Sequence, residues 1–326
     1  MSRRRRMFII ESNDALLNAD MPGYAALDYT DNMEAFLKSV KARNRSADTV
    51  QFYRQNLTRV RNILEEQDIS TQVNRITSDI IERHLIIYSM EELGNSYNTV
   101  SIRLRALRAF FNWLSSRNII RHNPMDDIVI SNVKTNVETY TREQLREIFR
   151  QPDLETFVGF RDYTIMTLLL ETGIRLRELT DIEVDDVNFA DSQIIIWGKN
   201  QTFRRVPFQK KTKTLLKRYL KIRGHSPVSY LFITQDDMKM SRKNVQDRIR
   251  KYGRMAGITN VRNSPHTFRH TFAKMAVQNG ANIFELQKIL GHKTLDMVRV
   301  YVNLFSRDVA RAHAKFSPVE NLNMPE

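Results

Sequence analysis

Apolar side chains recur at helical spacing in the N-terminal part of the chain. In residues 29–44, Met33, Phe36 and Val40 occupy the i, i+3 and i+7 positions, which lie on one face of an amphipathic helix. Three further segments repeat this spacing, and short polar stretches join them, as in a compact helical bundle. The pattern therefore predicts four helices, in residues 29–44, 46–67, 77–94 and 96–118. Ser46 is the N-cap candidate of the second helix, and Thr77 or Ser78 is that of the third.

The helical period is lost after Asn123-Pro124 and returns at Thr141. Thr141 and Gln144 fit the capping box S/T-x-x-E/Q, which predicts the start of a second helical region. An apolar helix follows and is broken at Gly173. The stretches SQIIIWG and FRRVPF, rich in β-branched and aromatic residues, then flank the polar turn GKNQT and predict a β-hairpin. The rest of the chain is predicted to be helical.

These patterns predict a mainly α fold in two domains, as the length of 326 residues also suggests. The first is an N-terminal helical bundle, and the second is a mixed, mostly α domain with a small antiparallel β-sheet. The expected boundaries are an N-terminal extension (1–28), the helical domain (29–125), a linker (126–137) and the second domain with a C-terminal tail (138–326).

The composition is that of a globular protein, with 41% hydrophobic and 27% charged residues. No apolar run reaches the ~18 residues that suggest a membrane-spanning helix. The start MSRRRRMFIIESND contains too short an apolar stretch for a secretory signal. The chain has no cysteine, which excludes disulfides, thiolate metal sites and a cysteine nucleophile and fits a reducing cytoplasm.

Positive charge is concentrated in the second domain. The chain has a net charge of +14, and residues 1–138 hold 19 basic and 17 acidic side chains, so most of the excess lies after them. A strongly basic domain attracts polyanions by releasing their counterions, largely without regard to sequence. The charge therefore favours a nucleic-acid partner, and the alternative is a basic surface without such a partner.

The chemically active side chains fall in four short segments of this basic half. Taken singly, each has an ordinary explanation as a surface ion pair, a solvated turn or a core aromatic residue. The segments are TGIRLREL with Arg175, WGKNQ with Lys199, SPHTFRHTFA with His266 and Arg269, and LGHKTLDMVRVY with His292 and Tyr301.

The spacing of His266 and His270 raises the alternative of a metal site, because zinc hydrolases use helical histidines four residues apart. The glutamate of the H-E-x-x-H motif is missing, however, and Arg269 stands beside the two histidines, where its charge would repel a cation. We therefore expect neither a metal nor another cofactor.

Together, these residues combine a candidate nucleophile with several cations and hydrogen-bond donors, which suits attack on a phosphodiester. In phosphoryl transfer the protein mainly positions the groups and stabilises the charge on the phosphate oxygens. Guanidinium groups match those oxygens and stay charged, so two arginines can replace a metal clamp. Nearby cations favour the phenolate form of a tyrosine, and a lysine can protonate the leaving oxygen as general acid.

In this order and at these spacings, the four segments resemble the tyrosine recombinase (phage integrase) family, including its Xer-type members. The family pattern is T-G-x-R-x-x-E-L, a lysine in a hairpin, H-x-x-R, and L-G-H with a tyrosine nine residues after the histidine. Each part is matched here between Thr172 and Tyr301. The helical bundle is similar to the family's SAM-like core-binding domain, so the resemblance covers about residues 29–310.

The resemblance implies the roles of the main site residues. Tyr301 attacks the scissile phosphate, which forms a 3′-phosphotyrosine link and releases a 5′-hydroxyl. Arg175 and Arg269 hold the non-bridging oxygens, and Lys199 is the general acid. Because the covalent link conserves the energy of the phosphodiester, the resemblance implies that neither ATP nor a metal is needed.

It also implies roles for the residues around them. His266 and His292 donate hydrogen bonds or assist proton transfer, and Glu178 supports the arginines. We interpret His270 as a structural residue of the same helix. Arginines elsewhere are candidates for phosphate contacts that position DNA, or for a solvated polar face. They are Arg103, Arg105 and Arg108 in the fourth helix and Arg204 and Arg205 in the second strand.

The partner implied by the resemblance is double-stranded DNA with paired inverted-repeat sites, bound by a homo-tetramer in the prokaryotic cytoplasm, at the nucleoid. The tail after Tyr301 would dock on a neighbouring protomer, and packing within its own chain is the alternative. Two rival functions stay open: relaxation of DNA in the manner of a type IB topoisomerase, and DNA binding without catalysis.

One segment departs from the pattern of Xer-type members, which often carry T-T-x-x-Y before the tyrosine. Here the stretch reads MVRVY, residues 297–301. Together with the arginine-rich start, this departure favours integration or excision of a mobile element. Xer-type resolution of chromosome or plasmid dimers is the alternative.

Overall fold

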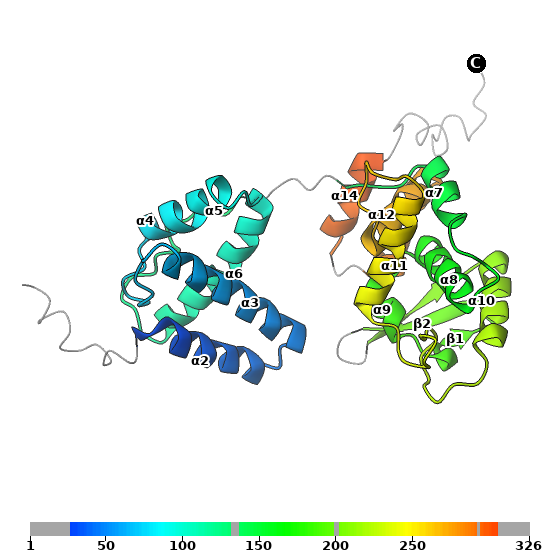
Figure 1. Cartoon of the computed structure of the whole chain (residues 1–326), viewed down its shortest axis with the longest axis horizontal. Helices are drawn as coiled ribbons and strands as arrows, with labels where there is room; N and C mark the ends of the chain where they lie inside the picture. Colours follow the sequence, from blue (N-terminus) through cyan, green and yellow to red (C-terminus); the bar gives the residue numbers. More distant parts are fainter. Residues whose placement is uncertain (1–26, 132–136, 199–201, 292–293, 306–326) are drawn as a thin grey trace, which may run out of the picture. The chain divides into compact units, whose positions relative to one another are not determined.

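The chain consists of two compact units, with the boundary between Thr135 and Asn136. This boundary lies within the segment 126–137 that the sequence predicts as a linker. Ile128, however, packs in the core of the first unit, so the chain belongs to that unit up to this residue. The computed structural model describes residues 27–131, 137–198, 202–291 and 294–305 (Figure 1).

The N-terminal unit is a bundle of helices, coloured blue to green in Figure 1. All four predicted helical segments are present, and the third is made of three short helices in direct succession. Of the two cap candidates of the third segment, Thr77 rather than Ser78 is the N-cap, and its hydroxyl accepts a hydrogen bond from the Ile80 N–H. The helices are α2 (Tyr29–Ala42), α3 (Ala47–Glu65), α4 (Ser78–Ile80), the π-helix η2 (Ile81–Ile87), α5 (Tyr88–Glu91) and α6 (Tyr97–Ser116).

Aromatic rings form the centre of this bundle. The Phe110 ring on α6 contacts Tyr29 and Phe36 of α2 edge to face, with centroid distances of 5.2 and 5.6 Å. The Tyr29 hydroxyl donates to the Leu57 carbonyl at 3.1 Å, so its polar tip is paired inside the core. These contacts join the first, second and fourth predicted helices through the apolar faces that the sequence pattern indicates.

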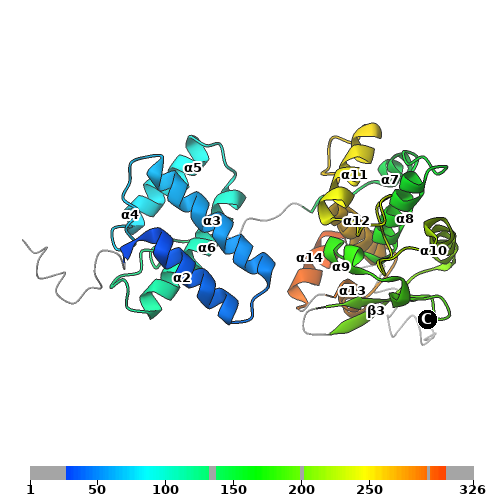
Figure 2. The same cartoon turned by 60° about the horizontal axis from the view of Figure 1, so that its bottom comes forward.

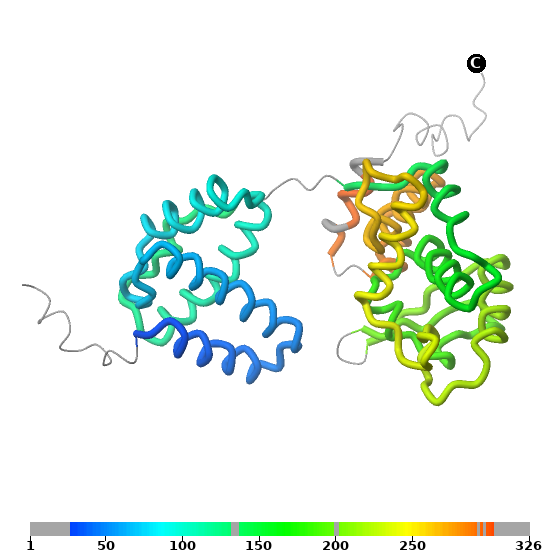
Figure 3. Tube along the Cα trace, viewed as in Figure 1, coloured from blue at the N-terminus to red at the C-terminus, as the bar shows by residue number. Residues whose placement is uncertain are grey.

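The C-terminal unit combines helices with one small sheet (Figures 1 and 3). It begins with α7 (Arg142–Phe149), α8 (Phe157–Thr172), α9 (Leu176–Asp181) and the 3-10 helix η3 (Val184–Asp186). The strands β1 (Val187–Asn188), β2 (Gln193–Trp197) and β3 (Phe203–Pro207) follow. The remaining helices are α10 (Lys210–Arg223), α11 (Arg242–Met255), α12 (Pro265–Gln278), α13 (Ile283–Leu290) and α14 (Asp296–Phe305).

The sheet is antiparallel in the order β1-β2-β3, and the predicted hairpin is its β2–β3 pair. Ile194 pairs with Val206 and Trp197 with Phe203. Strand β1 has two residues, which is too short to give a sequence pattern, and it was not predicted. The mainly α fold with a small antiparallel sheet is confirmed.

Helix α8 is the centre of the C-terminal unit and packs against both α10 and α12 (Figure 2). Helix α14 packs in turn on α12 and α13. The apolar run of α8 therefore faces neighbours on several sides, which explains why it lacks a polar face. The described parts of the chain contain no helix with the length and apolar character needed to cross a membrane.

A buried ionic network ties α8 to α11. Asp162 is 2% exposed and accepts hydrogen bonds from Arg161 at 3.0 and 2.8 Å and from the Tyr252 hydroxyl at 2.8 Å. Arg248 of α11 donates to the same carboxylate. The Asp162 carboxylate offsets the free-energy cost of burying the Arg161 guanidinium. Removal of the negative charge of Asp162 would leave this guanidinium buried without a counter-charge.

We therefore expect Asp162→Asn to lower the free energy of unfolding by about 3–5 kcal/mol, the usual effect of breaking a buried ion pair on one side. Urea denaturation of the full chain measures this. The matched control is Asp247→Asn, which removes exposed ion pairs with Lys243 and Arg250 on α11 and should leave the free energy of unfolding close to that of the wild type. Equal effects of the two substitutions would contradict a structural role for the network.

Candidate active site

The turn between α8 and α9 forms the first part of the site. Helix α8 ends at Gly173, whose left-handed backbone (φ 60°) lets its N–H bond to the Leu169 carbonyl at 3.0 Å. A side chain at this position would meet Phe272 Cδ1 at 2.4 Å, so both the backbone and the available space require glycine. The turn places Arg175 directly before the first residue of α9.

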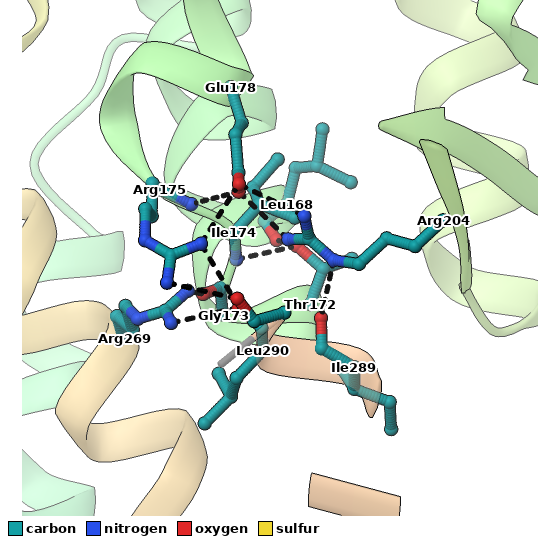
Figure 4. Close-up of polar contacts among 11 residues, drawn as sticks. Leu168, Thr172, Gly173, Ile174, Arg175, Glu178, Arg204, Arg269, Ile289 and Leu290 are labelled. Atoms are coloured by element: carbon teal, nitrogen blue, oxygen red, sulfur yellow. Dashed lines mark hydrogen bonds and ion pairs between the residues drawn. The ribbon is translucent and has the colours of Figure 1, made fainter. Parts of the chain in front are cut away.

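Glu178, in the first turn of α9, joins two arginines (Figure 4). Its carboxylate accepts hydrogen bonds from the Arg175 N–H at 2.8 Å and Nη1 at 3.0 Å. Both terminal nitrogens of Arg204 donate to it as well, at 2.9 and 2.8 Å. Burial raises the pKa of Glu178, but the hydrogen bonds and charges of Arg204 and Arg175 outweigh burial and hold this pKa below its usual value. The carboxylate is therefore ionised at neutral pH and fixes both guanidinium groups.

Arg269 on α12 is the most buried cation of the group, with 4% of its surface exposed. Its Nη1 donates to the Gly173 carbonyl at 2.5 Å and its Nη2 to the Leu290 carbonyl at 2.9 Å. Burial and the charge of Arg175 lower the pKa of Arg269 to about 10. Arg269 is thus still charged at neutral pH, and it is fixed by the ends of two helices.

The end of α13 also holds the other two arginines. Arg175 Nη1 and Nη2 donate to the carbonyls of Leu290 and Gly291 at 3.3 and 3.2 Å. Arg204 Nε donates to the Ile289 carbonyl at 3.0 Å. Carbonyls in the last turn of a helix have no partner within the helix and carry the negative end of its dipole. Figure 4 shows the three guanidinium groups gathered around these carbonyls and Glu178.

Tyr301 lies on α14 and is 5% exposed, with its ring packed beside Leu290 and Val298. Its hydroxyl is hydrogen-bonded to Arg269 and lies 2.8 Å from Nδ1 of His270. Burial raises the pKa of the Tyr301 phenol, and Arg269 and Arg175 lower it in part. The residue is therefore both a core aromatic and a site residue, and its hydroxyl lies in the site of its own chain.

Two histidines of α12 lie near the phenol side of the site, and His270 contacts the phenol itself. The rings of His266 and His270 are stacked at a centroid distance of 6.3 Å. Burial, followed by the charges of His266 and Arg269, lowers the pKa of His270 to about 4. Partial burial and three arginines, Arg269 first, also lower the pKa of His266. Both imidazoles are therefore neutral at neutral pH.

The structure brings together four of the residues that the sequence predicts for the catalytic set, and it adds one neighbour. Arg175, His266, Arg269 and Tyr301 converge, with Glu178 supporting the arginines as expected. Lys199 and His292 lie outside the described residues. His270, interpreted from the sequence as structural, contacts the phenol directly. The signal that could have revealed it is its place directly after Arg269 in HTFRH.

The arginines expected on DNA have varied surroundings. Arg204 is engaged by Glu178, so it supports the site rather than extending from the surface. Arg205 is exposed and lies over the Phe203 ring at 5.4 Å. On α6, Arg105 is exposed, whereas Arg108 donates to the Met125 and Ile128 carbonyls of the same unit. Arg103 has one buried terminal nitrogen without a hydrogen-bond partner among the described residues.

Two family models match the chain. The model described as "Phage integrase family" matches residues 138–307, and "Phage integrase, N-terminal SAM-like domain" matches residues 33–118. The chain belongs to the phage integrase family of tyrosine recombinases. Members of this family are enzymes that cleave and rejoin DNA through a covalent intermediate, and this recombinase is one of them.

Curated relatives cover most of the length of this recombinase. A tyrosine recombinase of Pseudothermotoga lettingae is 31% identical over 234 residues, 70% of this chain and 78% of that protein. Tyrosine recombinase XerC of Oceanobacillus iheyensis is 26% identical over 303 residues, 90% of this chain and 97% of that protein. Tyrosine recombinase XerD of Staphylococcus haemolyticus is 26% identical over 296 residues, 88% of this chain and 98% of that protein.

Solved structures share the fold of this recombinase. The XerH site-specific recombinase bound to a palindromic difH substrate gives a TM-score of 0.69 at 20% identity and covers 87% of this chain and 84% of its own. The Tn1549 transposon integrase, in complex with a circular intermediate DNA, gives a TM-score of 0.69 at 20% identity. The match covers 88% of this chain and 99% of that chain.

We expect Glu178→Gln to lower the free energy of unfolding by about 2–3 kcal/mol, because two guanidinium groups lose their shared counter-charge. Urea denaturation measures this. The double variant Glu178→Gln/Arg204→Gln should regain part of the loss, since it removes one of the stranded charges. Asp181→Asn, which changes an exposed carboxylate of the same helix, is the control and should cost less than about 1 kcal/mol. A double variant less stable than Glu178→Gln would contradict this account of the charge balance.

The low pKa of His270 predicts a loss of stability in acid. The unfolded chain protonates this imidazole below about pH 6.5, whereas the folded chain does so only near its pKa of about 4. Stability is therefore full above about pH 6.5 and falls as the pH drops toward about 4.

Between pH 7.5 and 5.0, the free energy of unfolding of the wild type should fall by about 1 kcal/mol more than that of His270→Asn, after allowance for solvent screening. His225→Asn, at an exposed histidine after α10, is the control and should behave like the wild type. Urea titrations at the two pH values test this. Equal losses for the wild type and His270→Asn would show that His270 titrates normally in the fold.

Proposed function

We propose that this recombinase cleaves and rejoins specific DNA sites with Tyr301 as its nucleophile. The observation that carries the proposal is that one buried arginine, Arg269, hydrogen-bonds the Tyr301 hydroxyl and shares the Leu290 carbonyl with Arg175, whose charge also lowers the pKa of the phenol. A phosphate bound by these two guanidinium groups would meet the phenol oxygen directly. The helix ends preorganise the cations, so little rearrangement is needed when negative charge develops on the phosphate.

In the proposed reaction, the Tyr301 oxygen attacks phosphorus and the 5′ oxygen leaves. Arg175 and Arg269 stabilise the non-bridging oxygens, and Lys199 protonates the leaving oxygen. His266 donates a hydrogen bond to the phosphate, as does His292. A neutral imidazole can do this from one ring nitrogen, and the low pKa of His266 is compatible with that role.

The test is a duplex nicked near the cut site, from which the cleaved fragment diffuses away and leaves the covalent adduct. We expect the wild type to accumulate adduct. Tyr301→Phe should bind the same DNA within about twofold and form none, because phenylalanine has no nucleophilic oxygen. Tyr230→Phe changes a half-buried tyrosine outside both the site and the groove between α8 and α12 and should match the wild type. Adduct formation by Tyr301→Phe would refute the assignment.

The same proteins, incubated with plasmids, separate recombination from relaxation. We expect recombinant products only from plasmids that carry two target sites. Relaxation of any plasmid without recombinants would instead identify a type IB topoisomerase activity. DNA binding by the wild type without adduct would identify a binding protein that lacks catalysis.

We also propose action as a homo-tetramer on paired inverted-repeat sites, with the tail after residue 305 docked on a neighbouring protomer. A groove of about 620 Å³ between α8 and α12 supports this, since its lining includes Tyr163, Leu170, Phe272 and Met275. An apolar groove of this size can receive the apolar face of a helical segment. The described residues contain no group that could hold a metal, and the proposed scheme assigns none a role.

For the biological role, we propose integration or excision of a mobile element. The MVRVY sequence before the nucleophile and the arginine-rich start support it, and the Tn1549 transposon integrase shares the fold. The second candidate, resolution of chromosome or plasmid dimers, is supported by the names of the XerC and XerD relatives. Adduct formation on DNA from the borders of a mobile element that carries the gene would support integration or excision. Adduct formation only on a chromosomal site outside such an element would support resolution of dimers.

A further inference from the structure

The attacking phenol has to lose a proton, and one side chain is in position to take it. Nδ1 of His270 lies 2.8 Å from the Tyr301 hydroxyl oxygen, and the two rings are 5.6 Å apart. We propose that His270 accepts the phenolic proton of Tyr301 during cleavage and returns it during religation. This inference rests on the proposed role of Tyr301 as nucleophile.

The position of His270 is fixed by the packing of α14 on α12. Tyr301 is 5% exposed, which limits access of bulk water to its hydroxyl. Arg269 precedes His270 on α12 and hydrogen-bonds the same hydroxyl. The described neighbours of this oxygen thus include a guanidinium, which can only donate, and an imidazole, which can accept. The phenolic hydrogen is best placed on the imidazole side.

The charges around His270 suit this task. Among the described residues, the charges that act on it are those of His266 and Arg269 on its own helix, and the titratable group that contacts it is Tyr301 on α14. Burial and its neighbours keep its imidazole neutral, so Nδ1 offers a lone pair when the proton of the ring is on Nε2. A bound phosphate adds negative charge beside Arg269, which offsets the effect of that arginine and raises the proton affinity of His270 during the reaction.

The proton balance closes over both steps. In cleavage, the Tyr301 oxygen bonds to phosphorus, the bond from phosphorus to the 5′ oxygen breaks, and the phenolic proton passes to Nδ1 of His270. The leaving oxygen takes a proton from the proposed acid, Lys199. In religation, the 5′-hydroxyl attacks and returns its proton to the lysine amine, while the departing phenolate regains its proton from the His270 imidazolium.

A substrate with sulfur in place of the bridging 5′ oxygen isolates this proton transfer. The thiolate leaves without protonation, so the general acid is no longer needed, whereas the phenol still has to be deprotonated. The nicked duplex is prepared with oxygen and with sulfur, and single-turnover adduct formation is measured for the wild type, His270→Asn, His270→Ala and Lys199→Ala. Asparagine retains a hydrogen-bonding group near the position of Nδ1 but cannot take up a proton.

We expect His270→Asn and His270→Ala to slow adduct formation by about 10²–10⁴-fold, the usual contribution of a general base, on both substrates. Lys199→Ala should be slow on the oxygen substrate and recover on the sulfur substrate. Raising the pH from 7 to 9.5 should bring the rate of adduct formation by His270→Asn closer to that of the wild type, because hydroxide then removes the phenolic proton. The circular dichroism spectrum and the DNA affinity of each variant are compared with those of the wild type to exclude misfolding. If His270→Asn or His270→Ala does not fold, His270→Gln is used in its place.

Three outcomes would overturn the inference. His270→Asn could form adduct within about threefold of the wild type, which would show that a hydrogen bond to position the phenol is sufficient. The sulfur substrate could restore His270→Asn, which would place His270 on the side of the leaving group. If the ratio of the wild-type rate to the His270→Asn rate is constant from pH 7 to 9.5, the substitution acts through the structure of the site and not through proton transfer. Absence of adduct with the wild type would instead refute the proposed function itself.

Discussion

The site depends on holding three guanidinium groups together against their mutual repulsion. The C-terminal unit does this by directing the last carbonyls of α8 and α13, with one carboxylate, toward the same point. Glycine is needed at both helix ends. Gly173 and Gly291 have left-handed backbones, and a Cβ on Gly291 would lie 2.8 Å from the Arg204 guanidinium. The residues that look like simple helix terminators in the sequence are thus part of the arginine cluster that we propose binds the phosphate.

The same arrangement has two opposing effects on the pKa of Tyr301, the proposed nucleophile. Packing on Leu290 and Val298 buries Tyr301 and raises its pKa, whereas the arginines beneath it lower that pKa in part. A phosphate that occupies the arginines would weaken their effect on the phenol at the moment when the phenol has to lose its proton. This conflict is the physical reason why a neutral acceptor next to the phenol matters, and His270 is the side chain that occupies this place.

Periodicity was sufficient to predict the helices and the hairpin. Each helix buries an apolar face over several helical turns, and the hairpin does so over several pairs of facing residues. Periodicity did not reveal β1, which has two residues, or the π-helical turn in residues 81–87, which changes the hydrogen-bond register without changing the pattern of apolar positions. The ordered motifs predicted the cations and the tyrosine. The pairing of Arg204 with Glu178 depends on a contact between residues 26 positions apart, and no local signal in the sequence encodes it. The contact of His270 with Tyr301 spans 31 positions. The sequence places His270 directly after Arg269 but does not show that its ring meets the phenol.

The central claim is that these cations serve one oxygen, that of Tyr301. Mass spectrometry of the trapped protein–DNA adduct, after digestion with trypsin and nuclease, tests it most directly. Trypsin cuts after Arg299 and Arg307, so the peptide of residues 300–307 contains Tyr301 as its only tyrosine. The account predicts a nucleotide attached to this peptide, with fragment ions that place it on Tyr301. Attachment to any other peptide, or to another side chain within this one, would contradict the account.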